Sequence, residues 1–402
     1  MTGNEAPAVP RAAAVYSYAA MALLGAVITI VNSTQGRLAG HYGVAENRIA
    51  LLISCIGVGR LVIQAVCGAL SDRFGRRIIV LLGFAGLTVF FAGMPFVTTL
   101  AGGMLMCVLC GISYGMVNTT MLALIFDCYA SSGRLDTAQV RVQTIYAVGA
   151  ILVPLGSSAL LAAGLPWQYL YRICGAAALV MILMKALVRF PPIAVRTERE
   201  NGYAEAPRMK REGVLLMLAT FCLYGAHTMG LTWISALAAN NTPMEPAESV
   251  FVLSILNIGA LLGSLLVMRL LRRYGNLRIL LIAPLIAAAC CGVLVTTRRA
   301  NMFRFFALAA GMCTGSLFNL LVGVAGHMFP KISGTISGMM ATSSSTAALV
   351  IPAATGLMLD HVSVGAMFSA VFVLLAAGFA LILVLTRRDR ILRGAAPRHF
   401  NR

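Results

Sequence analysis

Charged side chains are scarce in this sequence, and acidic ones scarcest of all. Of its 402 residues only 11% are charged, and 13 Asp and Glu stand against 31 Lys and Arg. With 59% hydrophobic residues and a mean hydropathy of +0.88, this composition excludes a chain built from soluble domains. The net charge of +18 would suggest nucleic acid as a partner of a soluble protein. Here the basic residues lie mainly between apolar runs, where they are typical topology signals, so we expect no nucleic acid.

Motifs that carry catalysis are also missing. The sequence has no Walker A loop, no zinc-ligand cluster and no nucleophile elbow, so we expect neither an enzyme nor an ATP-driven pump, and no cofactor or metal. All ten cysteines lie in apolar runs or at their edges, including Cys107 and Cys110. No histidine or polar loop accompanies them, which favours free buried thiols over disulfides or zinc.

Long apolar runs are what the sequence has in abundance. A membrane-spanning helix needs roughly 20 apolar residues to cross about 30 Å of hydrocarbon. Twelve such runs are present, and the first is too long for a signal peptide. They predict an all-α membrane protein with spans near residues 12–36, 48–70, 78–98, 103–126, 139–163, 168–189, 213–238, 249–271, 278–296, 303–326, 335–358 and 365–386.

The twelve runs fall into two groups of six. Residues 191–212 form the one long polar stretch, so we expect an N-terminal bundle (1–190), a linker (191–212) and a C-terminal bundle with a basic tail (213–402). Similar residues recur about 200 positions apart, which indicates an internal duplication of the kind found in transporters. The matched positions are Gly25-Ala26 with Gly225-Ala226, Gly59 with Gly259, Phe74-Gly75 with Tyr274-Gly275, Asn118 with Asn319 and Pro154 with Pro352.

Residues 68–77 carry the most specific motif of the chain, G-x-x-x-D-R-x-G-R-R. This stretch resembles the loop between the second and third helices of the major facilitator superfamily. The resemblance implies two pseudo-symmetric six-helix bundles, a site at the membrane midplane and a latch between the halves on the cytoplasmic side. The latch residues would be Gly68, Asp72, Arg73, Gly75 and Arg76; the alternative is a plain basic loop. In the second half Arg272 replaces the acid, so the second latch is degenerate.

The distribution of basic residues predicts the orientation. With the N-terminus inside, most Lys and Arg of the short loops are cytoplasmic, as the positive-inside rule requires. Both termini are then cytoplasmic. We expect a monomer in a bacterial inner membrane. The cytoplasmic basic residues would be Arg73, Arg76, Arg77, Arg134, Arg269 to Arg278, Lys331 and Arg387 to Arg402.

Arg60 falls in the middle of the second span, with Gln64 one turn away on the same face. An ionised Arg at that depth costs at least about 2.5 kcal/mol, so it should face a wet cavity or an opposite charge. One hypothesis is an anchor for a carboxylate, which a guanidinium fork suits. The alternative is a structural partner of Asp127 or of a backbone carbonyl.

Asp127 lies deeper in the apolar runs than any other acid. A carboxyl in a low-dielectric setting can carry a proton and couple transport to the proton gradient. The alternative is an interfacial acid paired with Arg134 or Arg141. His227 is likewise either a proton carrier or a hydrogen-bonded structural residue, and Trp233 either stacks on a ligand or anchors the helix at the interface.

Polar side chains recur at helical spacing on several spans. Each one alone can simply join two helices by a hydrogen bond. As a set they predict a central polar cavity, and the resemblance implies that the first, fourth, seventh and tenth helices line it. Besides Arg60 and Gln64, the candidate substrate-binding residues are Asn32, Gln35, Tyr114, Asn118, Gln143, Tyr146, Tyr224, His227, Asn257 and Asn319.

These observations favour secondary active transport of a small polar organic solute. Arg60 favours an organic anion such as a carboxylate, and Asp127 suggests symport with protons. The alternatives are a multidrug/proton antiporter, a neutral sugar/proton symporter, and a scaffold that binds a solute without moving it. The drug antiporters carry G-x-x-x-G-P-x-x-G-G in the fifth helix; here Val153 and the pair Ser157-Ser158 replace its glycines, which weakens that alternative.

Overall fold

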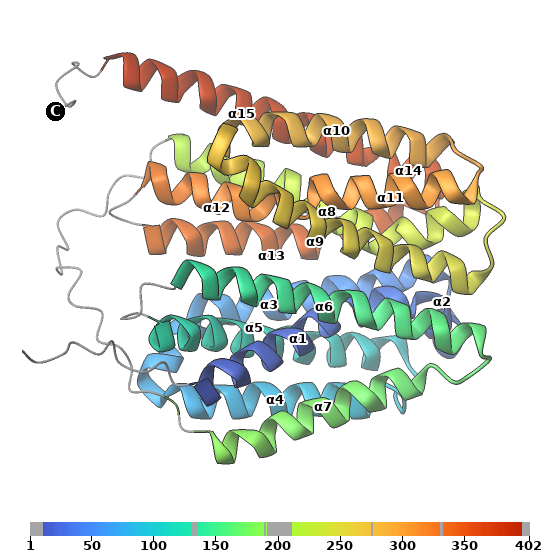
Figure 1. Ribbon diagram of the computed structural model, residues 1–402. Coiled ribbons are helices and arrows are strands. Elements are labelled where there is room, and N and C mark those ends of the chain that lie inside the picture. Colours follow the sequence, from blue (N-terminus) through green and yellow to red (C-terminus); the bar gives the residue numbers. More distant parts are fainter. Residues whose placement is uncertain are drawn as a thin grey trace, which may run out of the picture.

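The computed structural model describes residues 11–129, 135–188, 190, 211–274, 276–329 and 333–395 (Figure 1). Apart from short connections, these residues are helical, and none of them forms a strand. The helices of the first half are α1 (Arg11–Ser33), α2 (Gln35–Tyr42), the short 3-10 helix η1 (Glu46–Ile49), α3 (Ala50–Phe74), α4 (Arg76–Gly93), α5 (Leu100–Tyr129), α6 (Leu135–Ala162) and α7 (Gln168–Leu187). Those of the second half are α8 (Arg211–Asn241), α9 (Pro246–Tyr274), α10 (Asn276–Thr296), α11 (Ala300–Thr314), α12 (Leu317–Met328), α13 (Ser333–Met358), α14 (Val364–Phe368) and α15 (Ala370–Ala395).

These helices correspond to the twelve predicted spans. In the first span α2 continues α1, the tenth span is divided into α11 and α12, and the twelfth into α14 and α15. Nine helical segments within the described residues are long and apolar enough to cross a membrane. The span of α13 is more polar, since it carries the Thr/Ser run 342–346.

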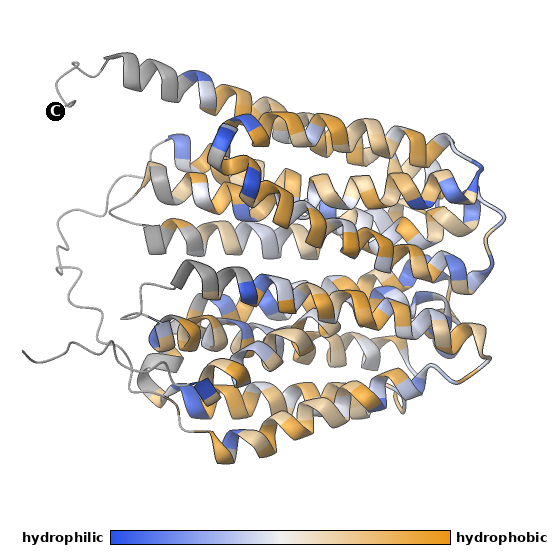
Figure 2. Cartoon of the chain, in the orientation of Figure 1, coloured by the Kyte–Doolittle hydropathy of each residue, from blue (hydrophilic) through white to orange (hydrophobic). Residues whose placement is uncertain are grey.

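The spans run side by side between two faces (Figure 1). We call the face with the beginning of α1, the Gly75 turn and the end of α15 the terminal face, and the face with η1 and α14 the far face. Hydrophilic residues concentrate near the helix ends, while the middles are largely hydrophobic (Figure 2). Large apolar side chains such as Leu105, Leu183 and Val373 are exposed. A lipid-facing surface has this pattern.

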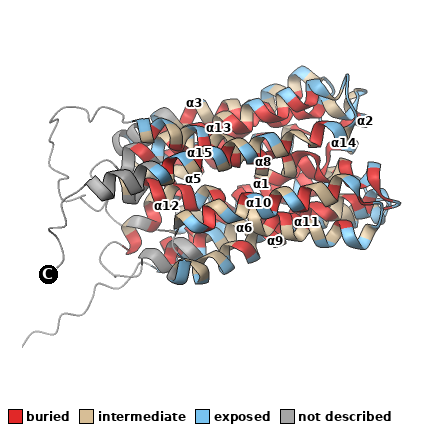
Figure 3. Cartoon of the chain, turned by 90° about the horizontal axis from the view of Figure 1, so that it is seen from above, coloured by how far each residue is buried: buried red, intermediate tan, exposed pale blue. Residues whose placement is uncertain are grey.

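The buried apolar side chains form two main clusters. One joins residues of α1 to α7, and the other joins residues of α8 to α15 with Ala50 of α3. Buried positions lie mostly where helices face one another (Figure 3). Between the halves, α3 packs against α13 and α6 packs against α9. Each half therefore has a core of its own, and these two helix pairs form the main contact between the halves.

Glycines set the closest helix crossings in both halves. A Cβ on Gly59 of α3 would collide with the Val108 carbonyl of α5, and a Cβ on Gly111 of α5 with the Ile56 carbonyl of α3. At an offset of 200, Gly259 of α9 and Gly311 of α11 meet in the same way, against the carbonyls of Leu308 and Leu256. The same contact thus holds equivalent helices together in each half.

We predict that Gly259→Ala lowers the free energy of unfolding by about 1–3 kcal/mol, because the added methyl group overpacks a backbone contact. Gly338→Ala in α13 is the matched control, since no heavy atom lies within 4 Å of its Cβ position. The control should be neutral or stabilising, because Ala favours a helix over Gly. Thermal unfolding of the purified protein measures both, and equal melting temperatures for the two variants would contradict the close crossing.

Candidate functional site

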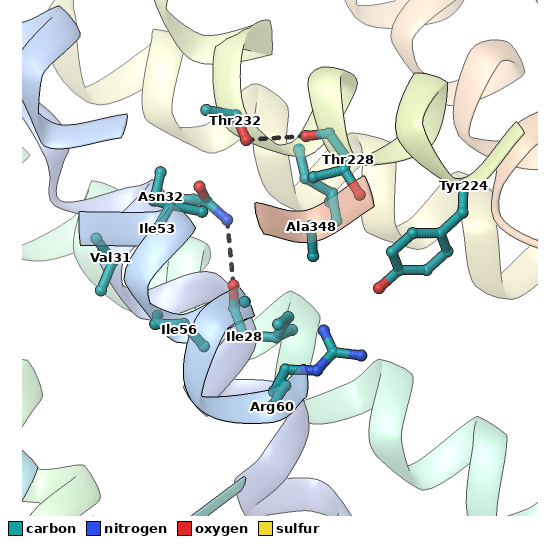
Figure 4. A pocket seen from close by; sticks show the side chains of 12 residues that line it. Ile28, Val31, Asn32, Ile53, Ile56, Arg60, Tyr224, Thr228, Thr232 and Ala348 are labelled. Atoms are coloured by element: carbon teal, nitrogen blue, oxygen red, sulfur yellow. Dashed lines mark hydrogen bonds between the residues drawn. The ribbon is translucent and has the colours of Figure 1, made fainter. Parts of the chain in front are cut away.

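A small cavity lies between the two halves at mid-span. It is about 30 Å³ in volume, room for one or two water molecules. Its walls come from α1 and α3 of the first half and from α8 and α13 of the second (Figure 4). The lining residues are Ile28, Val31, Asn32, Ile53, Ile56, Gly57, Arg60, Tyr224, Thr228, Leu231, Thr232 and Ala348.

Arg60 and three tyrosines form the charged end of this cavity. The Arg60 side chain is 7% exposed, and its guanidinium carbon lies 5.0 Å from the centre of the Tyr114 ring. The Tyr114 hydroxyl donates to the Tyr146 hydroxyl at 3.3 Å, and Tyr224 points toward Arg60 from α8 (Figure 4). A cation over an aromatic face is stabilised by the ring quadrupole, which offsets part of the cost of burying the charge.

Arg60 has no carboxylate partner among the described side chains, whose ion pairs are Arg48 with Asp360, Arg76 with Asp127 and Arg304 with Glu248. Its Nε is buried without a hydrogen-bond acceptor. The alternative that Arg60 pairs with Asp127 is therefore wrong. What remains is a buried cation beside a cavity, and such a group attracts an anion.

The opposite end of the cavity is neutral and polar. Asn32 donates through Nδ2 to the Ile28 carbonyl at 3.1 Å, while its Oδ1 is buried and accepts no hydrogen bond from any described residue. The Thr232 hydroxyl donates to the Thr228 carbonyl at 2.9 Å. Figure 4 shows this end separated from Arg60 by aliphatic side chains. Along the cavity, the lining therefore changes from the charged Arg60 through aliphatic side chains to the neutral amide of Asn32.

A larger vestibule of about 440 Å³ lies at the far-face ends of α1, α6, α8 and α9. Asn32 lines both spaces. Gln35 of α2 lines the vestibule and donates through Nε2 to the Thr232 carbonyl at 2.9 Å, so it joins the two halves where the vestibule meets the cavity. In this conformation Gln35 contributes to the wall between the spaces.

The halves are also tied together at the far face. Asn47 of η1 donates to the Gly356 carbonyl at 3.0 Å and to Asp360 Oδ1 at 2.7 Å. Arg48 forms an ion pair with the same carboxylate at 3.0 Å. These contacts hold the beginning of α3 against the end of α13.

The structure brings some of the predicted site residues together at the cavity and places others elsewhere. Asn32, Arg60 and Tyr224 line it, with Tyr114 and Tyr146 behind Arg60. Gln64 instead accepts from the Ser345 hydroxyl of α13 at 2.6 Å. Besides Gln64 and His227, the candidates Asn118, Gln143, Asn257 and Asn319 line neither the cavity nor the vestibule and do not lie next to Arg60. Asn257 donates to the Leu253 carbonyl of its own helix at 2.8 Å, and the side chains of Gln143 and Asn319 are exposed.

His227 and Trp233 both have protein partners. His227 Nδ1 lies 3.1 Å from the Thr314 hydroxyl, which itself donates to the Ala310 carbonyl. The hydroxyl must therefore accept, and Nδ1 carries a proton. Trp233 is 1% exposed and donates to Thr355 Oγ1 at 2.8 Å. The prediction of an interface anchor at Trp233 is wrong, because the ring packs inside the C-terminal bundle.

Two cavity residues were not predicted from the sequence. Thr228 and Thr232 line the cavity on the same face of α8 as Tyr224, and their spacing of four residues was the available signal. The aliphatic members of the lining had no such signal, because apolar residues occur on every face of these spans.

Asp127 at the end of α5 forms an ion pair with Arg76 at the beginning of α4. Arg76 also donates to the Ala123 carbonyl at 3.1 Å. Gly75, with φ of +84°, makes the turn that starts α4 at this point. The interfacial pairing was expected with Arg134 or Arg141; Arg134 lies outside the described residues, and the partner found is Arg76. The carboxylate is 1% exposed, and its coupling role stays a prediction.

The predicted latch is described only in part. Gly75 forms the turn and Arg76 binds Asp127. The surroundings of Gly68 and the side chains of Asp72 and Arg73 lie outside the described residues, so the latch role stays a prediction.

Comparisons with known proteins agree along the whole chain. The family model described as Major Facilitator Superfamily matches residues 13–298 and 216–399. "Uncharacterized MFS-type transporter YfkL" of Bacillus subtilis (strain 168) is 25% identical, with 92% of this chain and 95% of that protein covered. "Inner membrane transport protein YdiN" of Escherichia coli (strain K12) is also 25% identical, over 96% and 91%.

Two solved structures have a similar fold. The nucleoside transporter NupG, solved as a mutant, has a TM-score of 0.76 at 13% identity, covering 94% of this chain and 99% of its own. The D-xylose-proton symporter has a TM-score of 0.76 at 13% identity, covering 94% and 97%. At this identity the likeness extends to the fold and not to the substrate.

We predict that Asp127→Asn lowers the free energy of unfolding by about 3 kcal/mol, because it leaves the cation of Arg76 without its buried partner. A double-mutant cycle with Arg76→Gln should give a coupling energy of at least about 1 kcal/mol. Denaturant unfolding of the four proteins measures it. A stable Asp127→Asn protein whose transport no longer responds to a pH gradient would instead identify Asp127 as a proton carrier.

Proposed function

Because the chain belongs to the major facilitator superfamily, we propose that it is a secondary active transporter of a small organic anion, such as a carboxylate, working by alternating access. Membership in this family of non-enzymatic transporters agrees with the family resemblance of residues 68–77. We infer the chemical class of the substrate from the residues of this chain.

The observation that carries the anion proposal is Arg60. It is 7% exposed, lines the cavity between the halves and has no ion-pair partner among the described residues. A buried unpaired charge costs several kcal/mol. An anionic substrate supplies the missing partner, whereas a neutral sugar leaves the charge uncompensated and a cationic drug is repelled by it.

The two spaces suggest how the transport cycle proceeds. The cavity of about 30 Å³ is too small for an organic solute, so the halves must separate before one can bind there. The Gln35 bond to the Thr232 carbonyl stands between the cavity and the vestibule. Breaking it, and the contacts of Asn47 and Arg48 with Asp360, would open the site toward the far face.

We place the terminal face in the cytoplasm of a bacterial inner membrane. Described basic residues are more frequent on that face, which the positive-inside rule favours. In this arrangement the bundles 1–190 and 213–402 move as units joined by 191–212, and the Gly75 turn belongs to the cytoplasmic latch. The terminal-face residues include Arg76, Arg77, Arg141, Lys185, Arg211, Arg269, Arg273, Arg278 and Arg387, and the far-face residues are Arg37, Arg48, Arg172, Arg298, Arg299 and Arg304.

Proton coupling through Asp127 is part of the proposal. The carboxylate is buried near the cytoplasmic end of α5 with Arg76 as its partner. Protonation would release Arg76, so a proton could be exchanged for this ion pair during the cycle. The D-xylose-proton symporter, which shares the fold, couples by its name to the same ion.

We predict that Arg60→Gln abolishes stabilisation by organic anions and leaves the melting temperature of the unliganded protein unchanged or higher, because it removes a buried unpaired charge. Thermal shifts of the purified protein against organic acids, sugars and cationic drugs measure this, and uptake into vesicles shows whether the ligand is moved.

The matched control is Arg172→Gln. Arg172 also lies over a tyrosine ring, 5.6 Å from the centre of Tyr169, but on the exposed surface away from the cavity. This variant should keep the wild-type response. Sugars or cations as the stabilising ligands would overturn the anion proposal, as would organic-anion binding that survives Arg60→Gln.

A further inference from the structure

We infer that the transported anion is a monocarboxylate with an apolar middle and a hydrogen-bond donor at the end remote from its carboxylate. The inference rests on the proposed function and deepens it. Three properties of the cavity carry it: the number of its charges, the nature of its middle, and one unpaired oxygen at its neutral end.

The cavity offers one positive charge. Arg60 is the sole Lys, Arg or His among the described residues that line it. His227 lies away from the lining and bonds to Thr314. One carboxylate matches one guanidinium through paired charge-assisted hydrogen bonds. A second carboxylate would be buried without a cation, and that cost disfavours dicarboxylates.

The middle of the cavity is mainly apolar, and Thr228 is the one polar side chain among the lining residues there. Ile28, Ile53 and Ile56 face it from the first half, and Leu231 and Ala348 from the second. Burying apolar surface there is favourable, while hydroxyl groups placed against the aliphatic side chains would lose their water without gaining a partner. A polyhydroxylated solute therefore fits this region poorly.

At the neutral end, the side-chain amide of Asn32 carries an acceptor that has no donor among the described residues. Asn32 is 6% exposed, and the bond from its Nδ2 to the Ile28 carbonyl fixes which amide atom is the oxygen. Asn32 lines the cavity, and its Oδ1 is buried without a donor from any described residue. The Thr232 hydroxyl already donates to the Thr228 carbonyl. A hydroxyl or N–H on the ligand would satisfy Asn32 Oδ1, and a carboxylate would not.

The two ends are far enough apart for a chain of several carbons. Tyr224 and Thr232 lie eight residues apart on α8, a rise of about 12 Å, and side chains from both ends shorten the gap. A six-carbon series separates the three properties: 6-hydroxyhexanoate, hexanoate, adipate and 1,6-hexanediol. Binding of each to the purified full-length protein is measured by calorimetry at neutral pH.

We expect 6-hydroxyhexanoate to bind about fivefold more tightly than hexanoate, the usual effect of one hydrogen bond. Adipate and the diol should bind at least about tenfold more weakly than hexanoate, since each leaves a charge uncompensated. Asn32→Leu should remove the advantage of the hydroxyl group and leave hexanoate binding unchanged. Asn257→Leu is the control: Asn257 also donates to its own helix, at 2.8 Å, but lines neither space.

The outcomes separate the inference from the proposed function. Three results would overturn the inference alone, provided that other organic anions still need Arg60 for binding. They are equal affinity of the wild-type protein for hexanoate and 6-hydroxyhexanoate, tighter binding of adipate than of hexanoate, and no binding of any compound in the series. Tightest binding of the diol, unaffected by Arg60→Gln, would overturn both. The comparison of ligands on the wild-type protein needs no variant to fold.

Discussion

The buried charge of Arg60 is the constraint on which the centre of this molecule depends. A guanidinium at mid-membrane depth must be compensated, and here the nearest groups are aromatic rings and hydroxyls. Tyr114 lies beneath it and is held by Tyr146, while Tyr224 approaches from the other half. The protein stabilises the cation without neutralising it, and on this we base the proposal of an anionic ligand. Tyr224 belongs to the second half, so a separation of the halves would change its distance from Arg60.

Around this centre the chain forms two similar helix bundles, each of which is closely packed. Inside each bundle, Gly59 with Gly111 and Gly259 with Gly311 let helix backbones meet directly. Between the bundles, several polar contacts are single hydrogen bonds, such as those of Gln35 and Gln64. A hydrogen bond in a membrane bundle is worth only about 0.6 kcal/mol on average. The halves also pack closely, since a Cβ on Gly57 of α3 would collide with the backbone of Leu349 in α13. The few weak hydrogen bonds between the rigid halves suit a rocking motion.

The sequence predicted the helices well and the site in part. A chain with twelve apolar runs in lipid has few alternatives to twelve helices. Arg60 could be identified because a charge at that depth must be compensated by a partner or by water. Helical spacing indicates which face a residue occupies but not what lies opposite. For that reason Asn257 and Asn319 were grouped with Asn32, although they line neither space, and Ser345 went unrecognised as the partner of Gln64. The Arg76 partner of Asp127 was missed because the turn at Gly75 brings together residues about 50 positions apart.

The most direct test of the central claim compares a carboxylate with its neutral amide on the unmodified protein. Hexanoate and hexanamide have nearly the same shape and differ in charge. The ratio of their dissociation constants therefore measures how much the ligand's negative charge contributes to binding beside Arg60. A charge-assisted hydrogen bond contributes about 1.5–3 kcal/mol, which corresponds to a factor of roughly ten or more in affinity. The account predicts that hexanoate binds more tightly by at least this factor and that high salt does not remove the difference, because the site is buried. Equal dissociation constants for the acid and the amide would contradict it.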